Sequence, residues 1–317
     1  MTGWQLVWRA WSWEPSVVVG CVLLMGGYLL VTAHRTAIPA VTSGVSWPLA
    51  TGQPLPPMPG NAPPEPHRSR PWPKTGAYMA GVVVLLLALV SPLDTLGDRY
   101  LFSAHMAQHM LLVLVVPPLL LWGLPFSWAD IARRHTALAS IEAWIGCPPL
   151  SWLLGVGTLL GWHLPVFYEA ALRHEGIHIV QHLMFLITAT IFWWPVVGPG
   201  SERYDGRPWV VLLYLFGAAL ANSILGIVLT YAPVGIYPSY LAPADTLGIL
   251  PLLREQWGLT PAADQQAGGL LMWLPGGFVY LFAMIGTLAR WYAQTDGEMA
   301  TSGPPAHEGG APTGYQP

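Results

Sequence analysis

Long apolar runs alternate with short polar segments along most of this chain. Because the apolar core of a bilayer takes roughly 20 helical residues to cross, each run of that length predicts one transmembrane helix. Seven such runs occur, at residues 17–33, 76–93, 104–124, 149–167, 178–197, 209–230 and 268–290. The pattern therefore predicts an all-α fold, a polytopic transmembrane helical bundle of about seven spans.

The segments outside these runs divide the chain further. Residues 1–16 are rich in tryptophan, which favours an interfacial amino-terminal segment before the first helix. The loop at residues 34–75 contains eleven prolines, a composition that excludes helix or strand interiors and indicates an extended linker. We expect the membrane domain to span residues 17–292 and the Gly- and Pro-rich residues 293–317 to form a disordered tail.

Composition also indicates a membrane protein. Hydrophobic residues make up 53% of the chain and charged residues only 9%, whereas charged residues make up roughly a quarter of a soluble domain. The 17 tryptophans and 12 tyrosines suit the aromatic belts of a membrane interface. Cys21 and Cys147 are too few for a disulfide framework or a thiolate metal module. Soft-metal chemistry would therefore have to rest on histidine and methionine.

Lysine and arginine predict the orientation. With seven spans, nine of them fall on the side that holds the long loop and the carboxyl terminus, and four fall on the other side. Because positively charged loops are retained in the cytoplasm, we expect the amino terminus outside and the carboxyl terminus in the cytoplasm.

Histidines recur where predicted spans begin or end. HMAQHM opens the third span with His105 and His109, and HIVQH opens the fifth with His178 and His182, so the pattern H-x-x-Q-H occurs twice. Two histidines four residues apart share one face of a helix. His163 closes the fourth span, and DQQAGGLLMW opens the last. On the predicted orientation all four blocks lie on the extracytoplasmic side, which predicts one shallow cavity lined by histidine.

These residue types indicate metal binding. Imidazole suits copper, zinc, iron and nickel, and a thioether adds a preference for copper(I). The candidate ligands are His105, His109, His163, His178, His182, Met106, Met110 and Met272. Gln108, Gln181 and Asp264 are candidates for orienting the ring nitrogens that do not bind metal. A single histidine at a helix end is more often an interfacial or packing group, and a methionine in an apolar helix is more often core filler.

Three other functions stay open on the same residues. His174-Glu175-Gly176-Ile177-His178 matches the H-E-x-x-H motif of zinc metalloproteases, with Asp264 available as a third ligand, although that motif needs a regular helix and Gly176 falls inside it. Axial ligation of haem by histidines of different helices, such as His109 and His182, would give a membrane electron carrier. A copper permease would use the same ligands as a copper chaperone.

Four blocks resemble, in order and spacing, those of the CtaG family of assembly factors for caa-type cytochrome c oxidase. The blocks are HMAQHMLLVLVVPPLLLWG, WHLPVFYEAAL, HIVQHLMFLITATIFWWPVVG and DQQAGGLLMWLPGG. The resemblance implies a multi-pass protein of the bacterial plasma membrane that is not an enzyme. It implies a chaperone that binds copper and supplies it to the metal centres of the oxidase, with oxidase subunits and membrane lipid as partners and no nucleic acid. Zinc and haem stay open as alternatives.

Overall fold

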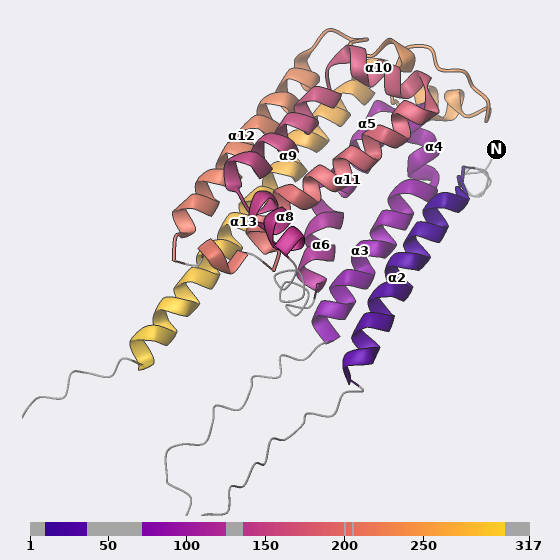
Figure 1. Cartoon of the computed structure of the whole chain (residues 1–317). Helices are drawn as coiled ribbons and strands as arrows, with labels where there is room; N and C mark the ends of the chain where they lie inside the picture. The colour runs from indigo at the N-terminus through magenta and orange to yellow at the C-terminus, as the bar shows by residue number, and fades with distance from the viewer. Residues whose placement is uncertain (1–9, 37–71, 125–135, 200, 205, 302–317) are drawn as a thin grey trace, which may run out of the picture.

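The fold is a bundle of helices (Figure 1). The computed structural model describes residues 10–36, 72–124, 136–199, 201–204 and 206–301. The longer helices are α2 (Pro15–Thr36), α3 (Trp72–Val90), α9 (Pro148–Trp162), α11 (Glu175–Val197), α12 (Pro208–Tyr231) and α13 (Pro261–Thr301). The shorter α-helices are α4 (Pro92–Arg99), α5 (Phe102–Met110), α6 (Val116–Gly123), α8 (Thr136–Ile145) and α10 (Pro165–Arg173). Single turns of other helix types are η1 (Leu111–Val115), η2 (Ser201–Tyr204), η3 (Pro238–Tyr240) and η4 (Leu252–Gln256).

The predicted all-α membrane bundle is confirmed. Within the described ranges the structure has no strand. Six helices are long and apolar enough to cross a membrane, and α8 with α9 makes a seventh if this pair, bent by 66°, counts as one span. The third of these spans runs from Phe102 to Gly123 and joins α5, η1 and α6.

The outer surface of the bundle is apolar. Leu23, Leu213 and Phe282 each expose about two thirds of their surface, and many other large apolar side chains are also exposed. A water-soluble monomer rarely exposes apolar patches this extensive, but lipid tails are as apolar as leucine and solvate such side chains. The bundle therefore has the surface of a protein that faces lipid.

The fourth span is shorter than predicted. We expected it to reach residue 167, but α9 ends at Trp162. Leu164 is extended, as expected for a residue directly before a proline, and Pro165 then begins the separate helix α10. The difference places His163 at the carboxyl end of α9, where the chain turns, and not inside a helix.

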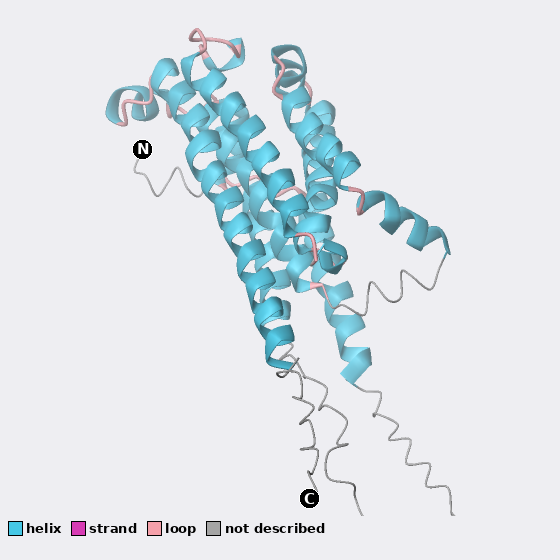
Figure 2. Cartoon of the chain, turned by 90° about the vertical axis from the view of Figure 1, so that its left-hand side faces the viewer, coloured by secondary structure: helices cyan, strands magenta, loops and turns pink. Residues whose placement is uncertain are grey.

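The two ends of the bundle differ. Helices α4 and α10 cover the end at which α5 and α11 begin, whereas α2 and α13 end at the opposite side (Figures 1 and 2). Helix α13 continues beyond the predicted boundary at residue 292 to Thr301. The predicted tail from residue 302 onward, most of the predicted linker, at residues 37–71, and residues 1–9 lie outside the described residues.

A turn of π-helix interrupts the third span directly after its histidines. Pro117 lies near this turn and has no N–H, so it cannot bond the carbonyl of Val113 four residues earlier. The indole Nε1 of Trp193 in α11 donates to the carbonyl of Val113 at 2.9 Å. In lipid an unpaired carbonyl is costly, so this bond both replaces the missing helical one and ties α11 to the third span.

Helix α13 packs closely on its neighbours through glycine. A Cβ atom on Gly226 of α12 would lie 2.9 Å from the carbonyl oxygen of Gly269 in α13. Such small residues let membrane helices approach backbone to backbone. Asn222 of α12 adds a polar link, because its Nδ2 donates to the carbonyl of Met272 at 2.7 Å. This contact fixes α13, which in turn supports α5.

Candidate metal centre

Five histidines lie together at the end of the bundle that α4 and α10 cover. Helices α5 and α11 both begin at this end (Figure 1), so they present their paired histidines at matching depths. The ring centroids of His105 and His178 are 5.4 Å apart, and those of His109 and His182 are 5.7 Å apart. The ring of His163, just after α9, lies 5.8 Å from that of His109. The predicted convergence of the two H-x-x-Q-H motifs is confirmed.

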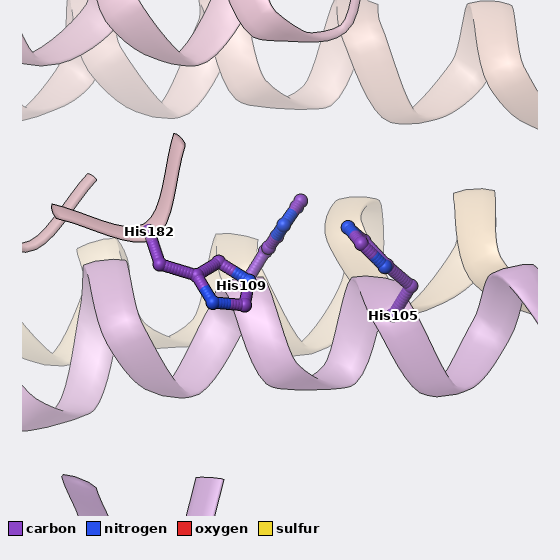
Figure 3. Close-up of side chains that lie close together, drawn as sticks. All are labelled: His105, His109 and His182. Atoms are coloured by element: carbon purple, nitrogen blue, oxygen red, sulfur yellow. The ribbon is translucent and has the colours of Figure 1, made fainter. Parts of the chain in front are cut away.

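Three of these residues, His105, His109 and His182, form what we call the inner group (Figure 3). Each offers one ring nitrogen, and the three atoms lie within 4.8 Å of one another. His105 and His109 are fully buried, and neither ring nitrogen of either residue has a hydrogen-bond partner in the described part of the chain. Buried polar groups nearly always have a partner. Three imidazoles around one point therefore form a donor set that fits a single transition-metal ion.

His163 borders the inner group and has a fixed orientation. Its Nδ1 lies 2.7 Å from the carbonyl oxygen of Leu159, which can only accept, so Nδ1 carries the proton. The other ring nitrogen, Nε2, is buried and has no hydrogen-bond partner within the described residues. Burial lowers the pKa of His163 to about 4, so the ring is neutral at physiological pH. Its free lone pair is available to the same region as the ring of His109.

A second set, which we call the outer group, consists of Asp98, His105 and His178. Their ligand atoms also lie within 4.8 Å of one another. The Oδ1 atom of Asp98 is 3.3 Å from Nε2 of His178 and 3.7 Å from Nδ1 of His105. Burial raises the pKa of Asp98 to about 8, and Asp94 adds to this effect while Arg99 opposes it. A metal ion beside this carboxyl group would favour its ionised form.

The sequence pattern predicts no role for Asp98. This residue lies in α4, a short helix in the segment that the apolar pattern predicts as a loop between the second and third spans. The available signal was a carboxylate seven residues before His105 on the same predicted side of the membrane. The signal was weak because carboxylates are common in loops, and only the packing of α4 on α5 gives this one a histidine neighbour.

The predicted methionine ligands lie in a different place. Met106, Met110 and Met272 are buried in the apolar core of the bundle. Met106 and Met110 pack against α13, where Cβ atoms on Gly268 and Gly276 would lie 3.2 Å from Cγ of Met106 and 3.5 Å from Sδ of Met110. Each of these two methionines follows a histidine by one residue in α5. It therefore points from a different face of the helix than the histidines do. Their position is that of packing residues.

The residues expected to orient the imidazoles have other partners. The Nε2 atom of Gln108 donates to the carbonyl of Ala88 and to Asp94, at 2.9 and 2.7 Å. Asp264 accepts hydrogen bonds from the backbone N–H groups of Phe102 and Ser103, at 2.8 and 3.0 Å, and so caps the start of α5 from a neighbouring helix.

Gln181 differs from the other two predicted orienting residues. It is fully buried in α11, directly before His182, and neither side-chain polar atom has a hydrogen-bond partner in the described ranges. The structure therefore shows no hydrogen bond between this amide and any of the histidine rings.

The H-E-x-x-H arrangement does not form a zinc site in this structure. His174 precedes α11 with an extended backbone (φ −132°, ψ 108°), while Glu175 is its first residue. The motif binds zinc when both histidines share a face of one helix, and here only His178 lies within the helix. Neither His174 nor Glu175 belongs to the groups of close metal-binding side chains among the described residues. His178 instead belongs to the outer group.

Residues 61–294 match the protein family described as cytochrome c oxidase caa3 assembly factor. The chain belongs to this family. The matched region contains both histidine groups and all helices from α3 to most of α13, and leaves out α2.

Among curated proteins, the chain is similar to uncharacterized proteins of Mycobacterium species. It is 25% identical to one from Mycobacterium leprae over 70% of this chain and 35% of the relative. It is 25% identical to one from Mycobacterium bovis over 72% of this chain and 36% of the relative. The chain thus spans about a third of the length of these relatives. No solved structure matches.

The chain also has an open groove away from the histidines. The groove has a volume of about 580 Å³ and lies between the third span, α11 and α13. Apolar side chains dominate its lining, and Arg290 lies at its edge, where its guanidinium donates to the carbonyl of Val196 at 3.0 Å. None of the groups of close metal-binding side chains among the described residues belongs to its lining.

Proposed function

We propose that this chain acts in cytochrome c oxidase assembly by binding copper through His105, His109 and His182 and passing the ion to an oxidase subunit. The observation that carries the proposal is the inner group: three imidazoles with close, unpartnered nitrogens in a chain of this family. The reaction is ligand exchange, so the protein needs no catalytic residue. It needs a site that holds the ion and opens to a partner.

The donor set favours copper over harder ions. Imidazole nitrogen is a ligand for copper and zinc, whereas magnesium and calcium select oxygen. An imidazole must be neutral to bind a metal. His105 and His109 are fully buried, in surroundings that disfavour a positive charge. The family's role in oxidase assembly supports copper as the cargo.

The packing of the site argues against haem. The ring of His109 lies 4.6 Å from that of Phe185, and the ring of His105 lies 5.2 Å from that of Tyr168. These side chains occupy the space beside the imidazoles where the wide porphyrin ring would have to lie. A single ion needs far less space than a porphyrin and would require only that the close ring nitrogens of the inner group converge on it.

Metal analysis of purified variants tests this function. We expect wild-type protein to bind copper, and His109→Ala and His182→Ala each to weaken binding by more than the roughly 10- to 100-fold that loss of an outer-shell partner costs. His174→Ala is the matched control, because His174 is an exposed histidine close by in sequence and outside both groups. Wild-type protein that takes up no copper, or that carries haem, would refute the proposal.

The same function requires the histidine end of the bundle to face the outside. We propose that the amino terminus lies outside the plasma membrane and the carboxyl terminus in the cytoplasm. Reporters fused at Gly258, near the start of α13, and after residue 317 should therefore give external and cytoplasmic signals. The opposite result would place the histidines at the cytoplasmic face and remove the argument for supplying an external copper centre.

A further inference from the structure

Helix α4 packs against α5 so that the carboxyl group of Asp98 lies beside His105 and His178. A Cβ atom on Gly97 would lie 2.9 Å from both the backbone N and the Cα of His105, so only glycine allows this approach. The hydroxyl of Tyr240 donates to the carbonyl of Gly97 at 2.7 Å and holds the helix there. The next residue, Asp98, is thereby placed against His105 and His178.

The two groups differ in exposure and share one residue. In the outer group, the side chains of Asp98 and His178 are 30% and 13% exposed. In the inner group, His109 is fully buried, and it lies one helical turn further along α5 than His105. His105 belongs to both groups, and both of its ring nitrogens lack a hydrogen-bond partner among the described residues.

We propose that the outer group is a second metal position, at which copper first binds before it passes to the inner group. The inference rests on the proposed function. Because His105 is common to both positions, the ion can exchange Asp98 and His178 for His109 and His182 without leaving the protein. Two neutral imidazoles with one carboxylate suit a position that attracts a cation from water and releases it to an all-imidazole site.

The alternative role for Asp98 is to orient the imidazoles. A carboxylate that accepts a hydrogen bond from a ligating histidine fixes its ring, and the loss of such a partner typically weakens metal affinity about 10- to 100-fold. The two roles make different predictions. An orienting carboxylate supports the equilibrium affinity of the inner group, whereas a first ligand supports the rate at which that group fills.

The experiment follows copper uptake by purified protein in lipid nanodiscs. Copper(I) is supplied from a buffered chelator complex, and both the uptake rate and the final occupancy are measured. We expect Asp98→Asn to slow uptake about tenfold or more while the final occupancy stays at the wild-type value. His178→Ala, which removes the other exposed ligand of the outer group, should do the same.

Asp94→Asn is the matched control. It makes the same substitution at the other aspartate of this short helix, but the Asp94 carboxylate is bonded to Ser12 and Gln108 and lies outside both groups. Its uptake rate should match the wild type. In His109→Ala, which breaks the inner group, residual weak copper binding should remain, and adding Asp98→Asn should abolish it.

The outcomes separate this inference from the proposed function. Wild-type protein that binds no copper would refute both. Normal copper binding with an unchanged uptake rate in Asp98→Asn would refute only the second position. A 10- to 100-fold loss of equilibrium affinity in Asp98→Asn at an unchanged uptake rate would likewise refute it and assign Asp98 the orienting role.

Discussion

Helix α5 packs against α13 on one side, and on another side its histidine rings meet the histidine rings of α11. The polar atoms on these two sides differ in whether they have hydrogen-bond partners. On the α13 side, Phe102 and Met106 fill the space that Gly268 leaves open. The backbone N–H groups at the start of α5 donate to the carboxylate of Asp264, which belongs to α13. Apolar side chains are packed and polar groups are paired on this side, as in the interior of most stable proteins.

On the α11 side, the buried polar atoms lack partners. Both ring nitrogens of His105 and His109 and Nε2 of His182 have no hydrogen bond in the described part of the chain. Leaving a buried donor or acceptor unsatisfied costs about 1–3 kcal/mol for each group. This arrangement of side chains therefore destabilises the folded protein, and the surrounding packing must offset that cost.

The comparison assigns different tasks to the two contacts. The α13 contact is optimised for packing, so it provides the rigid support that a preorganised site requires. The unpartnered groups on the α11 side lower the stability of the protein. Such a cost is expected where a ligand, once bound, supplies the missing partners. Substitutions on the α13 side should therefore lower stability. Substitutions on the α11 side should remove metal binding without lowering the stability of the metal-free protein.

The largest expected effect is on the α13 side. Gly268→Leu would place a side chain where even a Cβ atom lies 2.4 Å from the ring of Phe102, which is itself buried. Overpacking of this kind typically costs about 1–3 kcal/mol and can be worse where nothing can move. We expect a large loss of folded protein in the membrane and a lower midpoint of thermal unfolding in detergent.

Gly277→Leu is the control for this substitution. It lies in the same helix, but a Cβ atom there would meet nothing within 4 Å. Its abundance and unfolding midpoint should stay close to the wild type. Leucine is a better helix former than glycine, so equal losses for both variants would point to a cause other than the contact with Phe102, and the proposed supporting contact would lose its basis.

The sequence alone predicts the membrane bundle, in which the structure has six or seven candidate spans, and the meeting of the histidines. Apolar run length and the four-residue spacing of His105 and His109 are local properties of the sequence. They predict the structure well because a membrane-spanning helix must form all its backbone hydrogen bonds within itself. The fourth span was mispredicted at its end because Pro165 begins a new apolar helix, α10, which extends the hydrophobic run.

The parts of the site that sequence missed depend on which helices pack together. Met106 lies one residue from His105 and looked equally suitable as a ligand, but that single step turns it toward α13. Asp264 was expected near the histidines and instead caps α5. Asp98 was not considered, since its role depends on the contact between Gly97 and His105. The spacing of apolar and polar residues along one helix does not show which other helix it contacts.

The smallest expected effect has the opposite sign and lies on the α11 side. His109→Leu replaces a fully buried ring whose two nitrogens lack partners with an apolar side chain. Removing unsatisfied polar groups should stabilise the metal-free protein by about 1 kcal/mol, since each such group costs about 1–3 kcal/mol and the branched side chain fits the space of the flat ring less well. Thermal unfolding of metal-free protein in detergent should show a midpoint equal to or above the wild type, while copper no longer raises it as ligand binding does for the wild type. A clearly lower midpoint would mean that His109 contributes to packing or to a hydrogen bond, and the contrast between the two sides of α5 would then not hold.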